Sequence, residues 1–402
     1  MHGCPLARLG TRDSGGMNVY VHRLASALGR LGRQVDIFTR VHDTEEPSIV
    51  ELDENTRLIH LEAGPVDAPK ADLVHYLPNF LSQLKGFQQD NGLVYDTIHS
   101  HYWLSGWVGN ELATEWGVPH VATFHTLAEV KNRARVGEGR GGPRSGIERS
   151  VTAAADGIVV STGHERAALV QLYDVPEANV YVVPAGVDLD LFKPGDQATA
   201  REQLGLNGDR LLLYVGRLEP IKGLEVLMYT LGSMEEPGNV RLLVIGGDGE
   251  HDEGHQKMMG LARELNIEDR VDFLGSLSHG LLPLYYQAAD VCVVPSYYES
   301  FGLVALEAMA CGTPVVGSRV PGLETIVRDN WSGYLVPWHC PDAFVDRIEV
   351  LLANEELRHS MGEEAQVTAS GMSWGRMAAS VAEVYAELEE HGTQRLPSPL
   401  KG

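Results

Sequence analysis

The stretch that decides the fold is residues 295–316, Pro-Ser-Tyr-Tyr-Glu-Ser-Phe-Gly-Leu-Val-Ala-Leu-Glu-Ala-Met-Ala-Cys-Gly-Thr-Pro-Val-Val. The apolar run 291–294 precedes it and predicts a buried strand. A polar turn follows, and the apolar residues after the turn predict a short helix over 302–310. Gly312 and Pro314 are expected to end this helix, because glycine and proline terminate helices just past their last turn.

The start of this helix predicts a binding site for an anion. Ser300 is the expected N-cap. The free backbone N–H groups expected there are those of Phe301, Gly302, Leu303 and Val304. The positive end of the helix dipole lies behind them. Glu299 lies in the turn and Glu307 in the helix body. Carboxylates beside an anion site suit a ligand that carries both phosphates and hydroxyls, as a nucleotide sugar does.

The composition indicates a globular protein with two domains of ordinary size. The chain has 402 residues, of which 44% are hydrophobic and 22% charged. Its net charge of −23 argues against general binding to nucleic acid or to an anionic membrane. A polyanionic substrate would therefore have to meet a few local cations and helix ends.

The cysteines and the hydropathy pattern favour a cytoplasmic enzyme. The four cysteines, Cys4, Cys292, Cys311 and Cys340, show neither metal nor disulfide spacing. Two of them lie in apolar contexts, which fits a reducing compartment. No signal peptide opens the sequence, and no apolar run approaches the roughly 20 residues needed to cross a bilayer. We therefore expect no stable membrane insertion.

Short apolar runs alternate with helical patterns along nearly the whole chain, which predicts parallel α/β units. The strands expected in the first half are 34–39, 57–61, 97–101, 120–124, 157–161 and 180–183. Those expected in the second half are 210–215, 241–245, 271–274, 291–294, 314–317 and 333–336. We therefore expect two doubly wound, Rossmann-like domains.

The alternation of strands and helices is interrupted once, over 184–208. The prolines and glycines of this segment predict a connection between domains. We expect a first domain over 1–190 and a second over 191–373. A last helix and a frayed polar tail are expected over 374–402.

The beginning of the chain predicts an incomplete first domain. Gly15 and Gly16 precede a helix, as they would after the first strand of a doubly wound sheet. The residues before Gly15 contain almost no apolar run, so we expect the first N-terminal strand to be missing, or 1–6 to supply only its end. The glycines suit close approach to a ligand, and an ordinary βα turn has the same pattern.

The loop Gly-Arg-Leu-Glu-Pro-Ile-Lys-Gly at 216–223 follows the first strand of the second half. The guanidinium of Arg217 can donate paired hydrogen bonds to phosphate oxygens, and Lys222 adds a compact positive charge. Both side chains therefore suit a diphosphate. A solvated basic loop is the alternative, and it is less expected in so acidic a protein. The turn Ile-Gly-Gly-Asp-Gly at 245–249 lacks the third glycine and the helix of the dinucleotide fingerprint, which disfavours a nicotinamide or flavin enzyme.

Two histidine motifs end strands of the first half, at the edge where open α/β sheets bind ligands. They are Asp-Thr-Ile-His-Ser-His-Tyr-Trp at 96–103 and Thr-Phe-His-Thr at 123–126. His99 and His101 alternate on a strand, and no carboxylate–histidine spacing recurs, so no metal site is expected. His99 is interpreted as structural, and His125 at a strand tip as a functional candidate.

Residues 131–149 carry a positive local net charge, opposite in sign to the net charge of the whole chain. Six basic residues stand there against Glu138 and Glu148, namely Lys131, Arg133, Arg135, Arg140, Arg144 and Arg149. A mobile lid that supplies cations to an anionic acceptor is the functional hypothesis. A solvated, disordered loop is the alternative.

The motifs together resemble one family. They come in an order that is typical of retaining GT-B glycosyltransferases, the large bacterial family that includes sucrose-phosphate synthase. That order is a Gly-Gly turn, the 216–223 loop, the Gly-Gly-Asp-Gly turn and the pair Glu299 and Glu307. The resemblance covers essentially the whole chain. It implies two Rossmann-like domains that face across a cleft, with the last helix packed back on the first domain.

Three further motifs resemble the D-inositol-3-phosphate glycosyltransferase of mycothiol synthesis, which moves N-acetylglucosamine from UDP to inositol phosphate. They are Asp-Ser-Gly-Gly-Met-Asn-Val-Tyr at 13–20, His-Ser-His-Tyr-Trp-Leu-Ser-Gly at 99–106 and His-Thr-Leu-Ala-Glu-Val-Lys-Asn at 125–132. The acceptor-binding residues that this implies are Asn18, Lys70, Tyr102, Thr126 and Arg144. The glycine-rich basic loop departs from that family, so Arg144 and Arg149 both stay open as the arginine that meets an acceptor phosphate.

The family also implies roles on the donor side. The donor-binding residues are Gly16, Gly216, Arg217, Lys222, Glu299, Phe301, Gly302, Leu303, Val304 and Glu307. The catalytic candidates are His125, Arg217, Lys222 and Glu299. Arg217 and Lys222 would hold the diphosphate, Glu307 the ribose, and Glu299 and His125 the donor sugar.

The chemistry implied needs no cofactor. Charge develops on the leaving UDP, and cations and helix N–H groups stabilise it, so a divalent metal is compatible but not required. The expected partners are a UDP-sugar and a small polar acceptor, with no nucleic acid and with a homodimer left open. The alternatives are transfer to fructose 6-phosphate, as in sucrose-phosphate synthase, and a non-catalytic sugar-nucleotide-binding protein.

Overall fold

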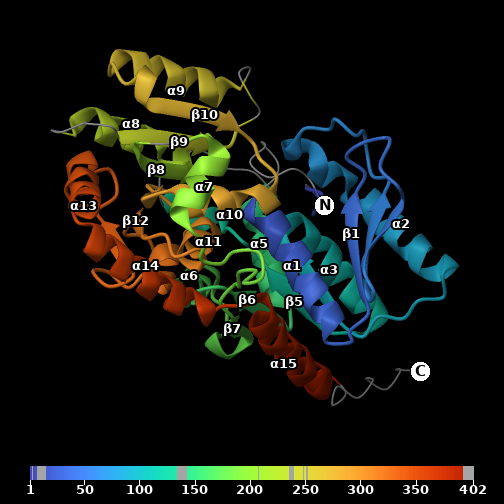
Figure 1. The fold of residues 1–402 in the computed structure, drawn as a ribbon. Helices are drawn as coiled ribbons and strands as arrows, with labels where there is room; N and C mark the ends of the chain where they lie inside the picture. Colours follow the sequence, from blue (N-terminus) through green and yellow to red (C-terminus); the bar gives the residue numbers. More distant parts are fainter. Residues whose placement is uncertain are drawn as a thin grey trace, which may run out of the picture. The chain divides into compact units, whose positions relative to one another are not determined.

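The computed structural model describes residues 1, 3–6, 15–133, 143–206, 208–234, 240–247, 249 and 252–392. The chain divides into two compact units (Figure 1). The first comprises Met1–Leu6, Met17–Pro184 and Gly375–Gly402, and the second comprises Ala7–Gly16 and Ala185–Trp374.

The units divide six residues before the boundary expected after residue 190. The early boundary has a packing reason. The Val187 N–H donates to the Met372 carbonyl at 2.9 Å, and a Cβ on Gly186 would lie 2.3 Å from the Trp374 nitrogen. Residues 185–187 are therefore bound to the end of the second unit.

The second unit holds one parallel sheet in the order β10-β9-β8-β11-β12-β13. Its strands are β8 (Arg210–Val215), β9 (Val240–Ile245), β10 (Val271–Gly275), β11 (Val291–Val294), β12 (Val315–Ser318) and β13 (Gly333–Val336). Its α-helices are α7 (Gln197–Leu204), α8 (Leu224–Ser233), α9 (Glu253–Glu264), α10 (Leu282–Ala288), α11 (Leu303–Ala310), α12 (Pro321–Ile326), α13 (Pro341–Ala353) and α14 (Glu355–Ser370). This is the doubly wound sheet that the alternation predicted.

The first unit holds two sheets, one in the order β1-β3-β2 and one, all parallel, in the order β4-β5-β6-β7. Its strands are β1 (Val35–Arg40), β2 (Ile49–Asp53), β3 (Thr56–Leu61), β4 (Ile98–His101), β5 (His120–Thr123), β6 (Gly157–Val160) and β7 (Val180–Val182). Its helices are α1 (Gly16–Arg30), α2 (Leu77–Asp90), α3 (Tyr102–Trp116), α4 (Ala128–Arg133), α5 (Pro143–Ala154), α6 (Gly163–Tyr173) and α15 (Trp374–Gly392). Within the described part of the chain, no strand precedes α1.

The twelve expected strands are all present, each with ends within one residue of those predicted. Sequence reasoning missed β2, which pairs antiparallel with β3 at the edge of the three-stranded sheet. Its burial alternates between exposed and half-buried, because only one face of this edge strand is covered. An edge hairpin of this kind carries a weaker apolar signal than a buried parallel strand.

Helix α15 packs on the strands of the first unit. Tyr385 Oη lies 2.6 Å from His99 Nδ1 on β4, and Thr97 Oγ1 donates to Glu389 Oε1 at 2.7 Å. Tyr181 Oη on β7 donates to Glu387 Oε1 at 3.0 Å. The last helix thus belongs to the first unit although the second unit separates the two in sequence. No helix among the described residues is long and apolar enough to span a membrane.

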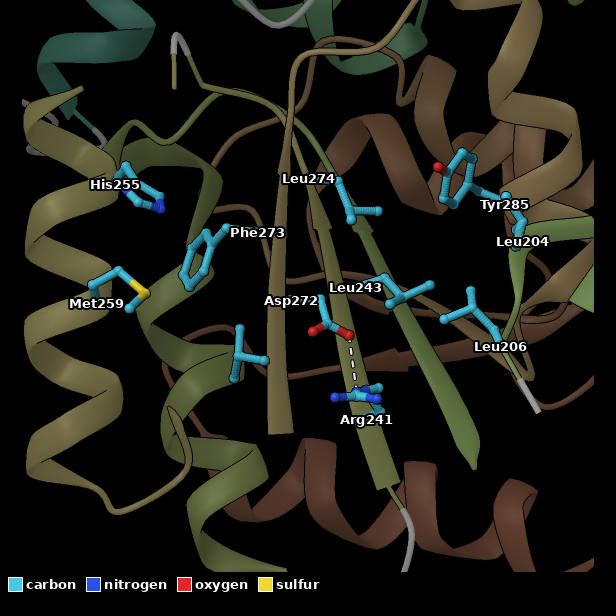
Figure 2. Close-up of a pocket in the computed structure, with 11 residues that line it drawn as sticks. Leu204, Leu206, Arg241, Leu243, His255, Met259, Asp272, Phe273, Leu274 and Tyr285 are labelled. Atoms are coloured by element: carbon cyan, nitrogen blue, oxygen red, sulfur yellow. Dashed lines mark ion pairs between the residues drawn. The ribbon is translucent and has the colours of Figure 1, made fainter. Parts of the chain in front are cut away.

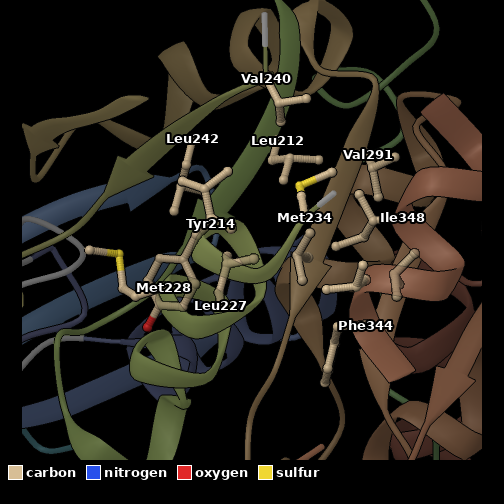
Figure 3. Close-up of a cluster of buried hydrophobic side chains, with 14 of the residues drawn as sticks. Leu212, Tyr214, Leu227, Met228, Met234, Val240, Leu242, Val291, Phe344 and Ile348 are labelled. Carbon is tan, nitrogen blue, oxygen red and sulfur yellow. The ribbon is translucent and has the colours of Figure 1, made fainter. Parts of the chain in front are cut away.

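The larger of the hydrophobic clusters in the second unit is the one in which α8 and α13 pack on the sheet (Figure 3). Leu212 and Tyr214 reach it from β8, Leu227 and Met228 from α8, and Phe344 from α13. These side chains are at most 2% exposed, so a ligand site on this unit rests on a tightly packed base.

Phe344→Ala should destabilise the second unit by about 3–5 kcal/mol, because the removed ring leaves a cavity in a packed core. Val350→Ala on the same helix is the matched control, since Val350 is 41% exposed. The control should change the free energy of unfolding by less than about 0.5 kcal/mol. Urea unfolding checks both, and equal effects of the two variants would contradict the assignment of Phe344 to the core.

Candidate active site

The second unit presents a candidate site at the point where its strand order reverses. The strand numbers rise outward from β8 on one side and from β11 on the other. The loops after these neighbouring strands diverge and leave room for a ligand at their carboxyl ends. Lys222 lies in the first loop and Glu299 in the second, and the Tyr297 N–H donates to the Ile221 carbonyl at 2.9 Å between them.

Lys222 and Glu299 meet directly. Lys222 Nζ donates to Glu299 Oε1 at 2.6 Å, and Ser296 Oγ donates to the same oxygen at 2.8 Å. The two charged side chains are only 24% and 13% exposed, so their attraction is screened less than at the surface. The structure thus brings together two residues that the sequence predicted for one site but for different parts of the ligand.

The helix expected after Glu299 is present as α11, but its cap differs from the prediction. Gly302, and not Ser300, is the N-cap, and the first bond of the helix runs from the Leu306 N–H to the Gly302 carbonyl at 3.0 Å. The orphan amides at this end are those of Gly302, Leu303, Val304 and Ala305. The candidate anion site therefore begins one residue later than expected, and the Phe301 amide lies outside the first turn.

Glycine is required at this cap. Gly302 has a φ of 92°, in the left-handed region that disfavours side chains, and a Cβ there would lie 2.6 Å from Leu323 Cδ2. A Cβ on Gly322, at the start of α12, would lie 2.4 Å from the Glu299 carbonyl oxygen. Helix α12 therefore packs against the turn and sets the position of Glu299.

Arg217 contacts a carboxylate of its own loop. Arg217 Nη1 donates to Glu219 Oε1 at 2.6 Å, and Tyr214 Oη donates to the Arg217 carbonyl at 2.8 Å. Arg217 and Glu219 are 32% and 40% exposed, so water screens this pair and an anionic ligand can compete for the arginine. Gly216 precedes Arg217 directly at the end of β8.

Both oxygens of Glu307 already have partners. His279 Nε2 lies 2.7 Å from Glu307 Oε1, and Tyr286 Oη donates to Oε2 at 3.0 Å. Burial, followed by the nearby Glu307 charge, raises the pKa of Tyr286 well above its ordinary value, so its hydroxyl stays a donor. Sequence reasoning missed His279 and Tyr286. The only signal was the position of His279 just after β10, at the ligand-binding edge of the sheet.

The first unit gathers histidines at the carboxyl ends of β4 and β5. His101 Nδ1 lies 3.1 Å from His125 Nε2, and the rings of His99 and His101 stack with centroids 4.4 Å apart. Burial lowers the pKa of His99 and of His125 to about 3, so both are neutral at pH 7. His125 and Tyr102 have φ angles of 60° and 75°, a strained conformation that is common at functional sites.

The hydrogen bonds of His99 define its tautomer. Thr123 Oγ1 donates its proton to the Val159 carbonyl at 3.1 Å, so it accepts from His99 Nε2–H at 2.9 Å. His99 Nδ1 then accepts from the Tyr385 hydroxyl. This satisfied, buried network agrees with the structural interpretation of His99.

Four of the five predicted acceptor residues lie together in the first unit. Arg144 Nη1 donates to Tyr102 Oη at 3.2 Å, and Arg144 Nη2 donates to the Thr126 hydroxyl at 3.0 Å. Lys70 Nζ lies 5.3 Å from the centroid of the Tyr102 ring. Arg144 Nε also pairs with the buried Glu148 at 2.7 Å. The group therefore combines two cations with two hydroxyls, as a phosphorylated polyol would require.

The other arginine and the fifth predicted acceptor residue have different partners. The Arg149 guanidinium lies over the Tyr173 ring, 5.2 Å from its centroid, and 4.0 Å from Glu129. Asn18 Nδ2 donates to the Cys4 carbonyl at 2.6 Å. Gly16 is the first residue of α1. Part of the basic segment 131–149, residues 134–142, lies outside the described residues, so the hypothesis of a lid stays a prediction.

A pocket of about 550 Å³ opens elsewhere on the second unit, beside the edge strand β10 (Figure 2). Its walls include Leu243, Phe273 and Leu274, and Arg241 Nε pairs with Asp272 Oδ2 across it at 2.9 Å. None of the predicted donor residues lines it. The candidate site is therefore the pair of loops after β8 and β11.

Known families and proteins match the chain along nearly its whole length. Residues 15–186 match the glycosyl transferase 4-like domain, and residues 196–368 match glycosyl transferases group 1. The D-inositol 3-phosphate glycosyltransferase of Xylanimonas cellulosilytica is 40% identical to this chain, and the match covers 99% of this chain and 97% of that one. The D-inositol 3-phosphate glycosyltransferase of Saccharomonospora viridis is 41% identical, and the match covers 96% of this chain and 92% of that one. The solved sucrose-phosphate synthase from Thermosynechococcus elongatus is 36% identical, with a TM-score of 0.90, over 97% of this chain and 98% of that one.

Acid should destabilise the fold through its buried histidines. Burial lowers the pKa of His99 and of His125 to about 3 and that of His120 to about 4, whereas a histidine in an unfolded chain titrates near about 6.5. Below that pH the unfolded chain binds more protons than the folded one, so the free energy of unfolding falls as the pH drops from about 6.5 towards 4. Glu165, whose pKa burial raises to about 7, acts oppositely and loses its contribution as the pH rises through that value.

Urea unfolding between pH 7.5 and 5 measures this dependence. His99→Gln should flatten the fall in stability on acidification, whereas His164→Gln, at an exposed position on α6, should leave it unchanged. A wild-type stability that is constant over this range would contradict the expectation of neutral buried histidines.

Proposed function

We propose a sugar transfer for this chain, which belongs to the group 1 glycosyl transferase family and is a GT-B glycosyltransferase. In this proposal the second unit binds a UDP-sugar and the first unit binds a small phosphorylated acceptor of the inositol phosphate type. The sugar moves to a hydroxyl of the acceptor with retention of its anomeric configuration.

The observation that carries the donor assignment is the contact of Lys222 with Glu299 at the switch point of the sheet, at 2.6 Å. A sugar diphosphate offers a phosphate to the lysine and hydroxyls to the carboxylate. Arg217 and the amides at the start of α11 add positive charge beside them. A ligand with only phosphates would leave Glu299 repelled, so this arrangement favours a nucleotide sugar.

The same groups account for the chemistry of transfer. The bond between the sugar and the diphosphate breaks with negative charge developing on the UDP leaving group, and Lys222, Arg217 and the α11 amides stabilise that charge. Attack on the same face lets the leaving phosphate take the proton of the acceptor hydroxyl, so no side chain has to act as a covalent nucleophile. We therefore expect added Mg²⁺ to leave turnover unchanged.

Glu307 is proposed to bind the ribose of the nucleotide. Its two oxygens already contact His279 and Tyr286, which orient the carboxylate without using all of its lone pairs. His125, neutral and held against His101, is proposed to contact the donor sugar as a neutral hydrogen-bonding group.

The acceptor assignment is supported by the group formed by Arg144, Lys70, Tyr102 and Thr126. Two cations beside two hydroxyls suit a phosphate attached to a polyol. The names of the curated relatives, at 40% and 41% identity, favour D-inositol 3-phosphate as that polyol. The sucrose-phosphate synthase match, at 36% identity, supports fructose 6-phosphate as the second candidate.

The cytoplasm is the proposed compartment. All four cysteines are free thiols, which fits a reducing environment.

A product screen by mass spectrometry tests the proposed reaction. UDP-glucose and UDP-N-acetylglucosamine are each paired with D-inositol 3-phosphate, fructose 6-phosphate and free inositol. A glycosylated inositol phosphate is the expected product. Sucrose phosphate would support the second candidate instead, and no turnover of either donor would indicate a binding protein without activity.

Lys222→Ala should lower turnover by at least about 100-fold, because the lost charge stabilises the leaving group, and loss of one such group costs about 3 kcal/mol or more. The variant should still fold, since Lys222 is partly exposed at a loop. Lys257→Ala is the control, because Lys257 is 62% exposed and pairs with Glu225 on the same unit. Turnover near that of the wild type in Lys222→Ala would refute the role at the diphosphate.

Lys70→Gln should raise the KM for the phosphorylated acceptor by about 10-fold or more, since a hydrogen bond to a charged group contributes about 1.5–3 kcal/mol. The KM for the donor should not change. Lys85→Gln is the control, because Lys85 pairs with Glu115 on the same unit. An equal loss with a phosphorylated and an unphosphorylated acceptor would contradict the assignment of Lys70 to the phosphate.

A further inference from the structure

A second group of metal-ligand side chains lies in the first unit, next to its three-stranded sheet. His60 is on β3, Glu46 is in the connection between β1 and β2, and Cys4 is near the beginning of the chain. One ligand atom from each lies within 4.8 Å of the other two. Cys4 and His60 are buried, whereas the Glu46 side chain is 24% exposed. None of the three belongs to the donor or acceptor residues described above.

The hydrogen bonds of His60 leave one ring nitrogen as a lone-pair donor. His60 Nδ1 lies 2.7 Å from the Pro47 carbonyl oxygen, which can only accept, so Nδ1 carries the proton. His60 Nε2 is therefore unprotonated in the neutral ring. It faces Cys4 Sγ at 3.5 Å and Glu46 Oε2 at 3.8 Å. A histidine whose second nitrogen is bound to a carbonyl is the usual arrangement of a metal ligand.

The other two side chains are also held by neighbours. The backbone N–H groups of His42 and Asp43 donate to Glu46 Oε2 at 2.9 and 3.2 Å. The segment that carries Cys4 is bound on both sides of the cysteine: Asn18 Nδ2 donates to the Cys4 carbonyl and Thr39 Oγ1 to the Gly3 carbonyl. The three groups are therefore positioned before any ion arrives.

The separations suit a small tetrahedral ion. Zinc binds sulfur at about 2.3 Å and nitrogen at about 2.0–2.1 Å, which places tetrahedral sulfur and nitrogen ligands about 3.5 Å apart. Cys4 Sγ and His60 Nε2 are 3.5 Å apart. We propose that Cys4, Glu46 and His60 bind one zinc ion. A thiolate, an imidazole and a carboxylate form a ligand set that favours zinc over calcium or magnesium.

The fourth coordination position of the zinc ion would be filled by water or by His42. Both ring nitrogens of His42 are buried and have no hydrogen-bond partner among the described residues. The His42 N–H donates to Glu46 Oε2 at 2.9 Å, so His42 lies beside the group. The nearby cation, Arg40, donates to the carbonyls of Pro65 and Val66, so its guanidinium is held by acceptors of its own.

The zinc ion would have a structural role. It would join the segment with Cys4 to β3 and to the connection between β1 and β2. A plain hydrogen bond from the Cys4 thiol to His60 Nε2 is the competing explanation of the same 3.5 Å distance. The two differ in whether the full-length chain takes up a metal.

Metal titration of the full-length protein separates them. After chelator treatment, the protein is titrated with Zn²⁺ in competition with a chromophoric chelator, and with Co²⁺ to detect a thiolate-to-cobalt charge-transfer band. We expect one zinc per chain, a cobalt–thiolate band and a rise in Tm on zinc addition. Cys4→Ser and His60→Gln should each weaken zinc binding by at least about 10-fold and abolish the rise in Tm.

The controls exclude adventitious binding. Cys340→Ser, at a free cysteine of the second unit, should keep the zinc affinity and the cobalt band of the wild type. His42→Gln should weaken binding only if His42 supplies the fourth ligand. The proposal is overturned if wild type and Cys4→Ser bind zinc equally. It is also overturned if wild type gives no cobalt–thiolate band, a result that does not depend on whether the variants fold.

Discussion

The ion pair between Lys222 and Glu299 is the interaction on which the proposed donor site depends. It joins the loops that leave two neighbouring strands in opposite directions, and its oxygen and nitrogen are 2.6 Å apart. Because both side chains are largely buried, removal of one leaves a partly desolvated charge. The pair thus keeps a lysine and a carboxylate in place before a ligand binds, and a nucleotide sugar is a ligand that can engage both.

The backbone around this pair is as constrained as the side chains. Gly302 caps α11 with a φ of 92°, and Gly322 leaves no room for a side chain between α12 and the turn that carries Glu299. The first unit has its own constraints, since Tyr102 and His125 adopt positive φ angles where β4 and β5 end. In both units backbone conformations that are unfavourable for residues with a side chain lie beside the groups proposed to bind substrate.

An acidic protein that binds anions must keep its few functional cations from being neutralised elsewhere. Three of the cations proposed to meet phosphate have a defined carboxylate partner: Lys222 has Glu299, Arg217 has Glu219 and Arg144 has Glu148. These partners hold the cations in position, and an anionic ligand must compete with them or share them. The net charge of −23 therefore does not contradict phosphate binding, because recognition depends on local pairs.

The sequence by itself determined every described strand except β2, the doubly wound architecture of the second unit and the residues of the proposed donor loops, because periodicity and turn residues report local structure. It also predicted the acceptor residues, four of which lie together. Only the tertiary structure decided the N-cap at Gly302, the different neighbours of Arg144 and Arg149, and the partners of Glu307. Lys222 and Glu299 are 77 residues apart, and Cys4 and His60 are 56 apart. Contacts at such separations depend on strand order and on backbone angles, which no local pattern encodes.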